Sequence, residues 1–326
     1  MTRWSLILLA CASFALPCEA RGGRARGPQV VEEPDGPHVR LHLEGDDAAQ
    51  AWLLKDAEPK EEGGKVDLLV ALHGAGGQPR NFLSPGMARE RNAWILAPAG
   101  HQAVQTDRGQ GHMWEGNDVE YVAEFVRYLV EKYPIAGERV IVWGLSAGGT
   151  MTLEMLAHAP ELFAGGVTTA APRTPDSRVD KLRVGVFLGT TDPNWAGAPA
   201  VRSYVEGLEK KRKKGACVFF AVEGLGHTTP AESYLSLSFD WVLQAEARGG
   251  EATVPQSPER HDGELQHILV RWRGSEGAPD DLKRSKGAAS KLIKDIQKSL
   301  GRGKAWFPIE ACCHSDDRST GPLGGT

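Results

Sequence analysis

The sequence predicts an α/β fold in which a mostly parallel sheet carries helices on both faces. Three observations lead to this prediction. Apolar runs of strand length occur at 66–72, 140–143, 184–188 and 217–222, and each is followed by a turn that contains glycine. An amphipathic helical pattern at 117–134 precedes the second run, and a helical segment at 148–159 follows it. Continuous apolar runs are typical of central parallel strands, which are buried on both faces.

The first apolar run leads into a glycine-rich loop. Residues 66–72 are followed by His73-Gly74-Ala75-Gly76-Gly77. Because glycine has no side chain, backbone N–H groups of this loop can face a ligand unobstructed. We expect His73 to brace the loop. The apolar residues of 117–134 recur at helical spacing, so we expect that helix to pack on the sheet through one face.

The second run ends in a serine-containing turn. Residues 140–143 pass into Gly144-Leu-Ser146-Ala-Gly148, and the helical segment that follows is closed by Pro160. This is the pattern of a nucleophile elbow, in which the serine is held in a strained backbone conformation where a strand and a helix pass close together. The pattern predicts Ser146 as a nucleophile. The alternative is a glycine-rich turn without chemistry.

A serine hydroxyl needs a general base, and the base needs a carboxylate to orient it. The run at 184–188 ends in a turn that presents Asp192, and the run at 217–222 ends in a glycine-flanked loop that presents His227. We expect Asp192 as the acid and His227 as the base. The alternatives, which do not follow an apolar strand downstream of the serine, are Asp176 and Asp180 for the acid and His101, His112 and His158 for the base.

The negative charge that develops on an attacked carbonyl oxygen needs hydrogen-bond donors. We expect the backbone amide of Ala147, directly after the nucleophile, to be one of them. The second should come from the loop after 66–72, with Ala75 as the first choice and Gly76 as the second. Trp114 and Trp195 are expected either to line a substrate pocket or to belong to the core.

These motifs resemble the polyhydroxybutyrate depolymerase and feruloyl esterase branch of the α/β-hydrolases, over residues 38–245. The resemblance implies a carboxylic ester hydrolase that forms an acyl-enzyme on Ser146, with His227 as base and then acid and Asp192 orienting the imidazole. It implies no cofactor and no metal. A small or oligomeric ester is the expected substrate, since no extra polymer-binding module is recognisable. The matching stretches are Leu-Leu-Val-Ala-Leu-His-Gly-Ala-Gly-Gly, Gly-Leu-Ser-Ala-Gly-Gly-Thr-Met, Leu-Gly-Thr-Thr-Asp-Pro and Gly-His-Thr-Thr-Pro.

The C-terminal part has a different character. A polar, Pro- and Gly-rich stretch at 246–263 predicts a linker. A short strand at 265–272 and a lysine-rich helix at 285–300 are expected after it. The helix could present a basic face to an acidic partner or simply to solvent.

Residues 264–326 resemble a parvulin-type peptidyl-prolyl isomerase, an α+β domain. The resemblance lies in a His-Ile-Leu-Val run and in a Ser-Asp-Asp turn before a Gly-Gly loop, and it assigns His267 and Asp317 to the isomerase site. Proline-containing polypeptides would be its partners. The later strands and the second histidine of the pattern have no counterpart, so we expect an incomplete domain, either a remnant or a truncated product.

The N-terminus predicts export. Arg3, an apolar run at 4–16 and a small-residue site ending at Ala20 match a secretory signal peptide at 1–20, followed by a leader at 21–37. The protein is expected to be secreted or periplasmic, and a lipoprotein signal ending at Cys11 is the alternative. Three cysteines remain after cleavage, too few for a disulfide framework.

The charge and hydropathy of the chain argue against a nucleic-acid-binding protein and against a membrane-spanning protein. A formal net charge of −4 gives no reason to expect a nucleic-acid partner, and no segment reaches the length of a membrane span. The leading hypothesis is therefore a secreted serine esterase. The alternatives are a serine peptidase of the prolyl-oligopeptidase kind, for which we see no upstream room for a propeller, a periplasmic folding factor, and a binding module with an inactive hydrolase pocket.

Overall fold

The computed structural model describes residues 29–107, 109–175, 177–179, 182–211, 216–243, 250–255, 268–278, 282–300, 311 and 314–316. Several predictions fall outside these residues. They are the signal peptide at 1–20, the isomerase-site residues His267 and Asp317, and the alternative acids Asp176 and Asp180.

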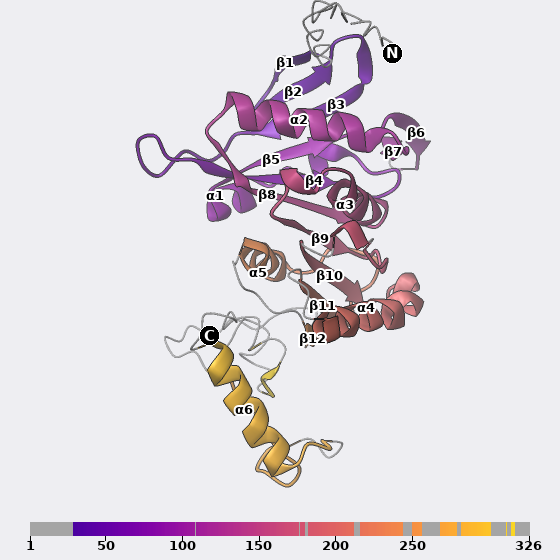
Figure 1. Cartoon of the computed structure of the whole chain (residues 1–326). Helices are drawn as coiled ribbons and strands as arrows, with labels where there is room; N and C mark the ends of the chain where they lie inside the picture. Colours follow the sequence, from indigo (N-terminus) through magenta and orange to yellow (C-terminus); the bar gives the residue numbers. More distant parts are fainter. Residues whose placement is uncertain are drawn as a thin grey trace, which may run out of the picture.

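Ten strands of the described chain form one sheet in the order β1-β2-β3-β5-β4-β8-β9-β10-β11-β12 (Figure 1). The pairs from β5 to β12 are parallel, while β1, β2, β3 and β5 pair antiparallel. The predicted mostly parallel sheet is confirmed. The strands are β1 (Val30–Asp35), β2 (His38–Leu43), β3 (Asp46–Leu54), β4 (Val66–Leu72), β5 (Ala93–Pro98), β8 (Ile135–Leu145), β9 (Gly165–Thr169), β10 (Arg183–Gly189), β11 (Ala216–Glu223) and β12 (Gly250–Pro255).

Helices cover both faces of the sheet. Alternate residues of β4 point to opposite sides, so that Leu68 and Val70 belong to one apolar cluster and Leu69 to the other. Residues of α2, α3 and α4 complete the first cluster, and residues of α1 and α5 complete the second. The helices are α1 (Pro85–Arg91), α2 (Asp118–Lys132), α3 (Ala147–His158), α4 (Ala198–Lys211), α5 (Glu232–Leu243) and α6 (Lys286–Leu300).

A separate two-stranded hairpin, β6 (Gln102–Thr106) and β7 (Gly109–Met113), follows β5. Its second strand forms an antiparallel bridge between His112 and Gly77. The hairpin is therefore attached to the glycine-rich loop after β4, which is the loop expected to supply backbone donors.

Two predicted boundaries are wrong. The leader predicted at 21–37 contains β1, which pairs along its whole length with β2. The linker predicted at 246–263 contains β12, which pairs in parallel with β11 at the edge of the sheet. Both strands lie at the edges of the sheet, and their pairing is set by distant segments, so local composition did not reveal them.

The strand predicted at 265–272 is also not formed in its described part. The backbone there is hydrogen-bonded to a distant turn: Leu269 N–H donates to Ser315 Oγ at 3.1 Å, and Arg271 N–H donates to Asp316 Oδ2 at 2.5 Å. The predicted helix is present as α6, and it packs Ala289 and Ile296 against Val270 in a small cluster of its own.

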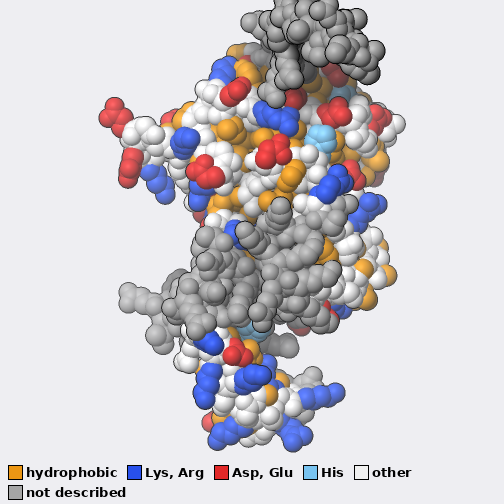
Figure 2. Space-filling view, viewed as in Figure 1, with side chains coloured by type: hydrophobic (Ala, Val, Ile, Leu, Met, Phe, Trp, Pro, Cys, Tyr) orange, Lys and Arg blue, Asp and Glu red, His pale blue; other side chains and the backbone are white. Residues whose placement is uncertain are grey.

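Exposed lysines lie along α6, and Figure 2 shows blue side chains gathered on the part of the molecule that this helix forms. They are Lys286, Lys291, Lys294 and Lys298. None of the described helices combines the length and the apolar character that crossing a bilayer requires.

Candidate active site

Ser146 lies between the end of β8 and the first turn of α3. Its backbone has φ 56° and ψ −116°, a conformation that L-residues avoid. Ser146 N–H donates to the carbonyl of Thr169 in β9 at 2.8 Å, so the neighbouring strand holds the turn in place. Such strain costs about 1–3 kcal/mol and persists only when the surroundings fix it.

The glycines that flank Ser146 are required by the packing of the turn. A Cβ on Gly144 would lie 2.3 Å from the backbone of Gly148, and a Cβ on Gly148 would lie 2.2 Å from the carbonyl oxygen of Leu72. Only glycine lets β8, α3 and the end of β4 approach this closely. The elbow geometry predicted from the sequence is therefore present.

The side chains of Ser146, His227 and Asp192 form a continuous chain of hydrogen bonds. His227 Nε2 lies 2.8 Å from Ser146 Oγ, and His227 Nδ1 lies 3.1 Å from each carboxylate oxygen of Asp192. The carboxylate of Asp192 is fully buried, whereas 39% of the His227 side chain is exposed. With Nδ1 donating to Asp192, Nε2 is free to accept the hydroxyl proton of Ser146.

The loops that carry Asp192 and His227 are joined to each other by two threonines. Thr191 Oγ1 donates to the carbonyl of Leu225 at 2.9 Å, and Gly224 N–H donates to Thr190 Oγ1 at 2.9 Å. Asp192 also accepts the N–H of Asn194 at 2.7 Å, which fixes its carboxylate. The sequence pattern does not single out these positioning threonines, although they directly precede the predicted acid.

Two backbone amides near Ser146 have no hydrogen-bond acceptor within the described chain. They belong to Ala147, at the first turn of α3, and to Ala75, in the loop after β4. The loop lies against the nucleophile turn, since a Cβ on Gly74 would be 3.5 Å from the Cβ of Ser146. The second choice, Gly76, is wrong because its N–H already donates to the carbonyl of His112 at 2.8 Å.

A cavity of about 670 Å³ opens beside Ser146 and His227. The loop after β4 forms one wall, and residues of the β6–β7 hairpin form another. Polar side chains that the sequence analysis did not single out line it: Gln78, Asn81, Thr106, Asp107 and Gln110. Their positions depend on the hairpin packing beside the loop, which no local pattern reveals.

Neither predicted tryptophan lines this cavity. Trp114 stacks on the ring of His73 at 4.4 Å between centroids, and its Nε1 donates to the His73 carbonyl at 2.7 Å. Trp195 packs on Phe219 with centroids 6.4 Å apart. Both indoles therefore support the scaffold.

His73 braces the loop, as predicted. It is completely buried, its Nδ1 donates to the Gly74 carbonyl at 2.7 Å, and its Nε2 accepts the N–H of Gly100 at 3.0 Å. Burial lowers the pKa of His73 to about 4, so the ring is neutral at physiological pH.

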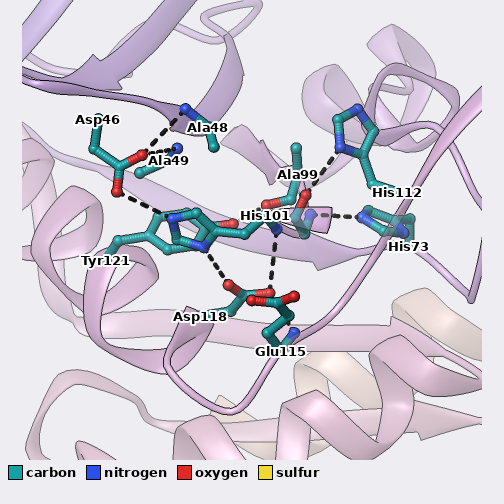
Figure 3. Close-up of polar contacts among 11 residues, drawn as sticks. Asp46, Ala48, Ala49, His73, Ala99, His101, His112, Glu115, Asp118 and Tyr121 are labelled. Atoms are coloured by element: carbon teal, nitrogen blue, oxygen red, sulfur yellow. Dashed lines mark hydrogen bonds and ion pairs between the residues drawn. The ribbon is translucent and has the colours of Figure 1, made fainter. Parts of the chain in front are cut away.

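The histidines considered as alternative bases have other partners. His112 Nδ1 donates to the Gly100 carbonyl at 2.9 Å, and His158 lies in the last turn of α3. His101 lies between Asp46 and the buried carboxylate of Asp118 (Figure 3). None of the three is hydrogen-bonded to Ser146. In the part of the chain that the structure describes, His, Cys, Asp and Glu form no cluster that could hold a metal ion.

Comparison with known proteins relates this site to hydrolases. Residues 106–174 match the prolyl oligopeptidase family. The chain is 26% identical over 188 residues to an acetylxylan esterase of Coprinopsis cinerea, and this match covers 51% of this chain and 49% of the relative. It is 31% identical over 119 residues to feruloyl esterase B of Neurospora crassa, and this match covers 31% of this chain and 38% of the relative. It is 30% identical over 173 residues to a poly(3-hydroxybutyrate) depolymerase of Ralstonia pickettii, and this match covers 44% of this chain and 34% of the relative.

The chain thus spans between about a third and a half of the length of these curated relatives. Among solved structures, a carboxylesterase of Bacillus cereus superposes with a TM-score of 0.44 and 18% identity, over 62% of this chain and 97% of that one. The relatives named as esterases or as a depolymerase agree with the resemblance that the sequence motifs carry.

Proposed function

We propose that the chain is a secreted serine hydrolase that cleaves carboxylic esters through an acyl-enzyme on Ser146. The observation that carries the proposal is the hydrogen-bonded chain from Ser146 through His227 to the buried Asp192. The similarity to proteins named acetylxylan esterase and feruloyl esterase supports the ester as the bond that is cleaved.

In the first half of the reaction, Ser146 Oγ attacks the ester carbonyl while His227 Nε2 accepts its proton. Asp192 keeps Nδ1 protonated and stabilises the imidazolium that forms. The amides of Ala75 and Ala147 donate to the negative oxygen of the tetrahedral intermediate; the loss of one such donor typically costs about 100-fold or more in kcat. The intermediate collapses, His227 protonates the leaving alcohol, and the acyl group remains on Ser146.

In the second half, a water molecule replaces the alcohol. His227 takes a proton from the water as it attacks the acyl carbonyl, and then returns a proton to Ser146 Oγ. The partial exposure of His227 gives water access to the base. The acid product leaves, and the starting hydrogen-bond chain is restored.

The substrate that we propose is a small or oligomeric ester. The cavity beside Ser146 has many amide and hydroxyl groups and one carboxylate, that of Asp107, among its described lining residues. Such a lining favours a neutral polar substrate over an anionic one, because a negative group would face Asp107.

A serine peptidase is the second candidate, because residues 106–174 match the prolyl oligopeptidase family. The esterase is favoured because three relatives carry names of ester-cleaving enzymes. For the C-terminal segment, we propose a parvulin-like unit with proline-containing polypeptides as partners. Export through the signal peptide at 1–20 belongs to the same proposal.

The experiment compares residues 21–326 with a Ser146→Ala variant on acetyl, butyryl and feruloyl esters and on a prolyl peptide anilide. We expect Ser146-dependent hydrolysis of at least one ester and little cleavage of the anilide. Preferred cleavage of the anilide would establish the peptidase instead. Activity that survives in Ser146→Ala would contradict both candidates.

A further inference from the structure

A network of hydrogen bonds connects the loop at 73–77 with β3, β5 and α2. Its centre is the turn Ala99-Gly100-His101 that follows β5 (Figure 3). Gly100 N–H donates to His73 Nε2 at 3.0 Å, and the Gly100 carbonyl accepts from His112 Nδ1 at 2.9 Å. A Cβ on Gly100 would lie 2.1 Å from the Met113 carbonyl oxygen, so the turn fits closely between its neighbours.

The two histidines that hold Gly100 also hold the donor loop. His73 begins the loop and bonds the Gly74 carbonyl through Nδ1 at 2.7 Å. The backbone of His112 pairs with the other end: Gly76 N–H donates to the His112 carbonyl at 2.8 Å, and His112 N–H donates to the Gly77 carbonyl at 3.0 Å. The peptide that carries the Ala75 amide is therefore fixed on both sides by residues that depend on Gly100.

His101 fixes the turn from the opposite direction. Its Nδ1 is hydrogen-bonded to Asp118, whose carboxylate is fully buried at the start of α2, and its Nε2 lies 3.2 Å from Asp46 Oδ2 at the start of β3. The ring of Tyr121 packs edge-on against the ring of His101, with 4.6 Å between the ring centroids. The Tyr121 hydroxyl donates to the Ala99 carbonyl. Charge-assisted hydrogen bonds of this kind are stronger and more directional than neutral ones.

The ionisation of His101 agrees with this geometry. Burial alone would lower the pKa of His101, but its hydrogen bonds to Asp118 and Asp46 and the charges of these carboxylates outweigh burial, and the pKa is raised above its ordinary value. The cation is thus stabilised between two carboxylates. Asp46 is held in turn by the N–H groups of Ala48 and Ala49.

We propose that His101, held by Asp118 and Asp46, is a positioning residue for the oxyanion-binding loop. It acts through Gly100 on His73 and His112, and so on the direction in which the Ala75 amide points. The proposal rests on the proposed function, since the Ala75 amide matters only if an oxyanion forms at Ser146. Misplacing a catalytic group by about 1 Å can cost about 100-fold in rate.

The test uses the chain 21–326 with two changes at one position and one control. His101→Ala removes both side-chain links and keeps only the backbone N–H bond to Asp118, whereas His101→Asn keeps a donor close to the place of Nδ1, and its side chain can still bond Asp118. The control is Asp67→Asn, because Asp67 is a buried carboxylate at the start of β4, ion-paired with Arg139, at the other end of the strand that leads into the loop.

We expect His101→Ala to lower kcat about 10- to 100-fold with KM nearly unchanged, because the lost interaction is made in the transition state. His101→Asn should recover most of that loss, and Asp67→Asn should keep kcat while lowering the melting temperature. Amide hydrogen exchange followed by mass spectrometry should be faster across 73–77 in His101→Ala, and not in Asp67→Asn. An unchanged kcat and unchanged exchange in His101→Ala would overturn the proposal.

The two proposals fail in different ways. If the wild-type chain hydrolyses no ester, the proposed function fails, while exchange across 73–77 still reports whether His101 holds the loop. If His101→Ala and Asp67→Asn lower kcat equally and in step with stability, His101 is only a structural residue and the positioning role is refuted. If kcat falls only in His101→Ala and returns in His101→Asn, the positioning role stands.

Discussion

An alanine at position 148 tests how tightly the nucleophile turn is packed. The added Cβ would lie 2.2 Å from the carbonyl oxygen of Leu72 and 2.5 Å from that of His73. Since an ordinary contact between carbon and oxygen is about 3.3 Å, β4 and α3 would have to separate by about 1 Å. Both atoms that the Cβ meets are backbone atoms, so no side chain can rotate away to relieve the clash.

The expected cost has two parts. Overpacking of this kind destabilises a fold by about 1–3 kcal/mol. The forced movement also separates the loop at 73–77 from Ser146, and a displacement of about 1 Å is worth about 100-fold in rate. We therefore expect Gly148→Ala to lose several degrees of melting temperature and about two orders of magnitude in kcat/KM.

The assay measures ester hydrolysis and thermal unfolding of Gly148→Ala beside Gly207→Ala. Gly207 lies in α4, where an added Cβ meets nothing within 4 Å. Alanine there should raise stability by up to about 1 kcal/mol, because alanine is the better helix former. If Gly148→Ala kept full activity and the wild-type melting temperature, the close packing of β4, Ser146 and α3 would be refuted.

Four further predictions concern the triad, the pH dependence of two histidines and the sheet edge. Asp192→Asn should lower kcat by about 10⁴-fold at neutral pH by favouring the wrong tautomer of its partner, and steady-state kinetics with an unchanged kcat would contradict this. The pKa of His73 falls from 6.5 to about 4 on burial, so the free energy of unfolding should decrease by about 3 kcal/mol as the pH drops from 6.5 to 4. Urea unfolding should show this loss of stability, and His73→Gln should reduce it. His101 has a raised pKa, so its contribution should instead be present at low pH and be lost as the pH rises through that value; a stability curve whose pH dependence is the same in His101→Asn as in the wild type would count against it. A chain that ends before β12 should unfold at a lower temperature than one that ends after it, because β11 would become an unpaired edge, and equal melting temperatures would contradict the pairing.

Sequence patterns anticipated the elements whose signals are local. The apolar runs became β4, β8, β10 and β11, because strands buried on both faces leave continuous apolar stretches. Ser146, Asp192 and His227 could be selected because each follows such a run, and the carboxyl ends of parallel strands meet at one edge of a sheet. The structure brings these three side chains into hydrogen-bond contact.

Features that depend on distant partners could not be predicted in this way. Gly76 was a reasonable donor by sequence, but its N–H is taken by the carbonyl of His112, on a hairpin that no local signal attaches to the loop. Sequence alone allows Trp114 as a pocket wall, because its stacking on His73 depends on a contact between distant segments. The edge strands β1 and β12 are short, and only their pairing identifies them as strands.

The most direct test of the central claim is the intact mass of the protein after rapid mixing with an activated acetyl ester. The account predicts that the wild-type chain gains one acetyl group, that peptide mapping places it on Ser146, and that Ser146→Ala gains none. Two results would contradict the proposed serine mechanism. One is hydrolysis at the wild-type rate by Ser146→Ala, and the other is an acetyl group that forms during turnover on a residue other than Ser146.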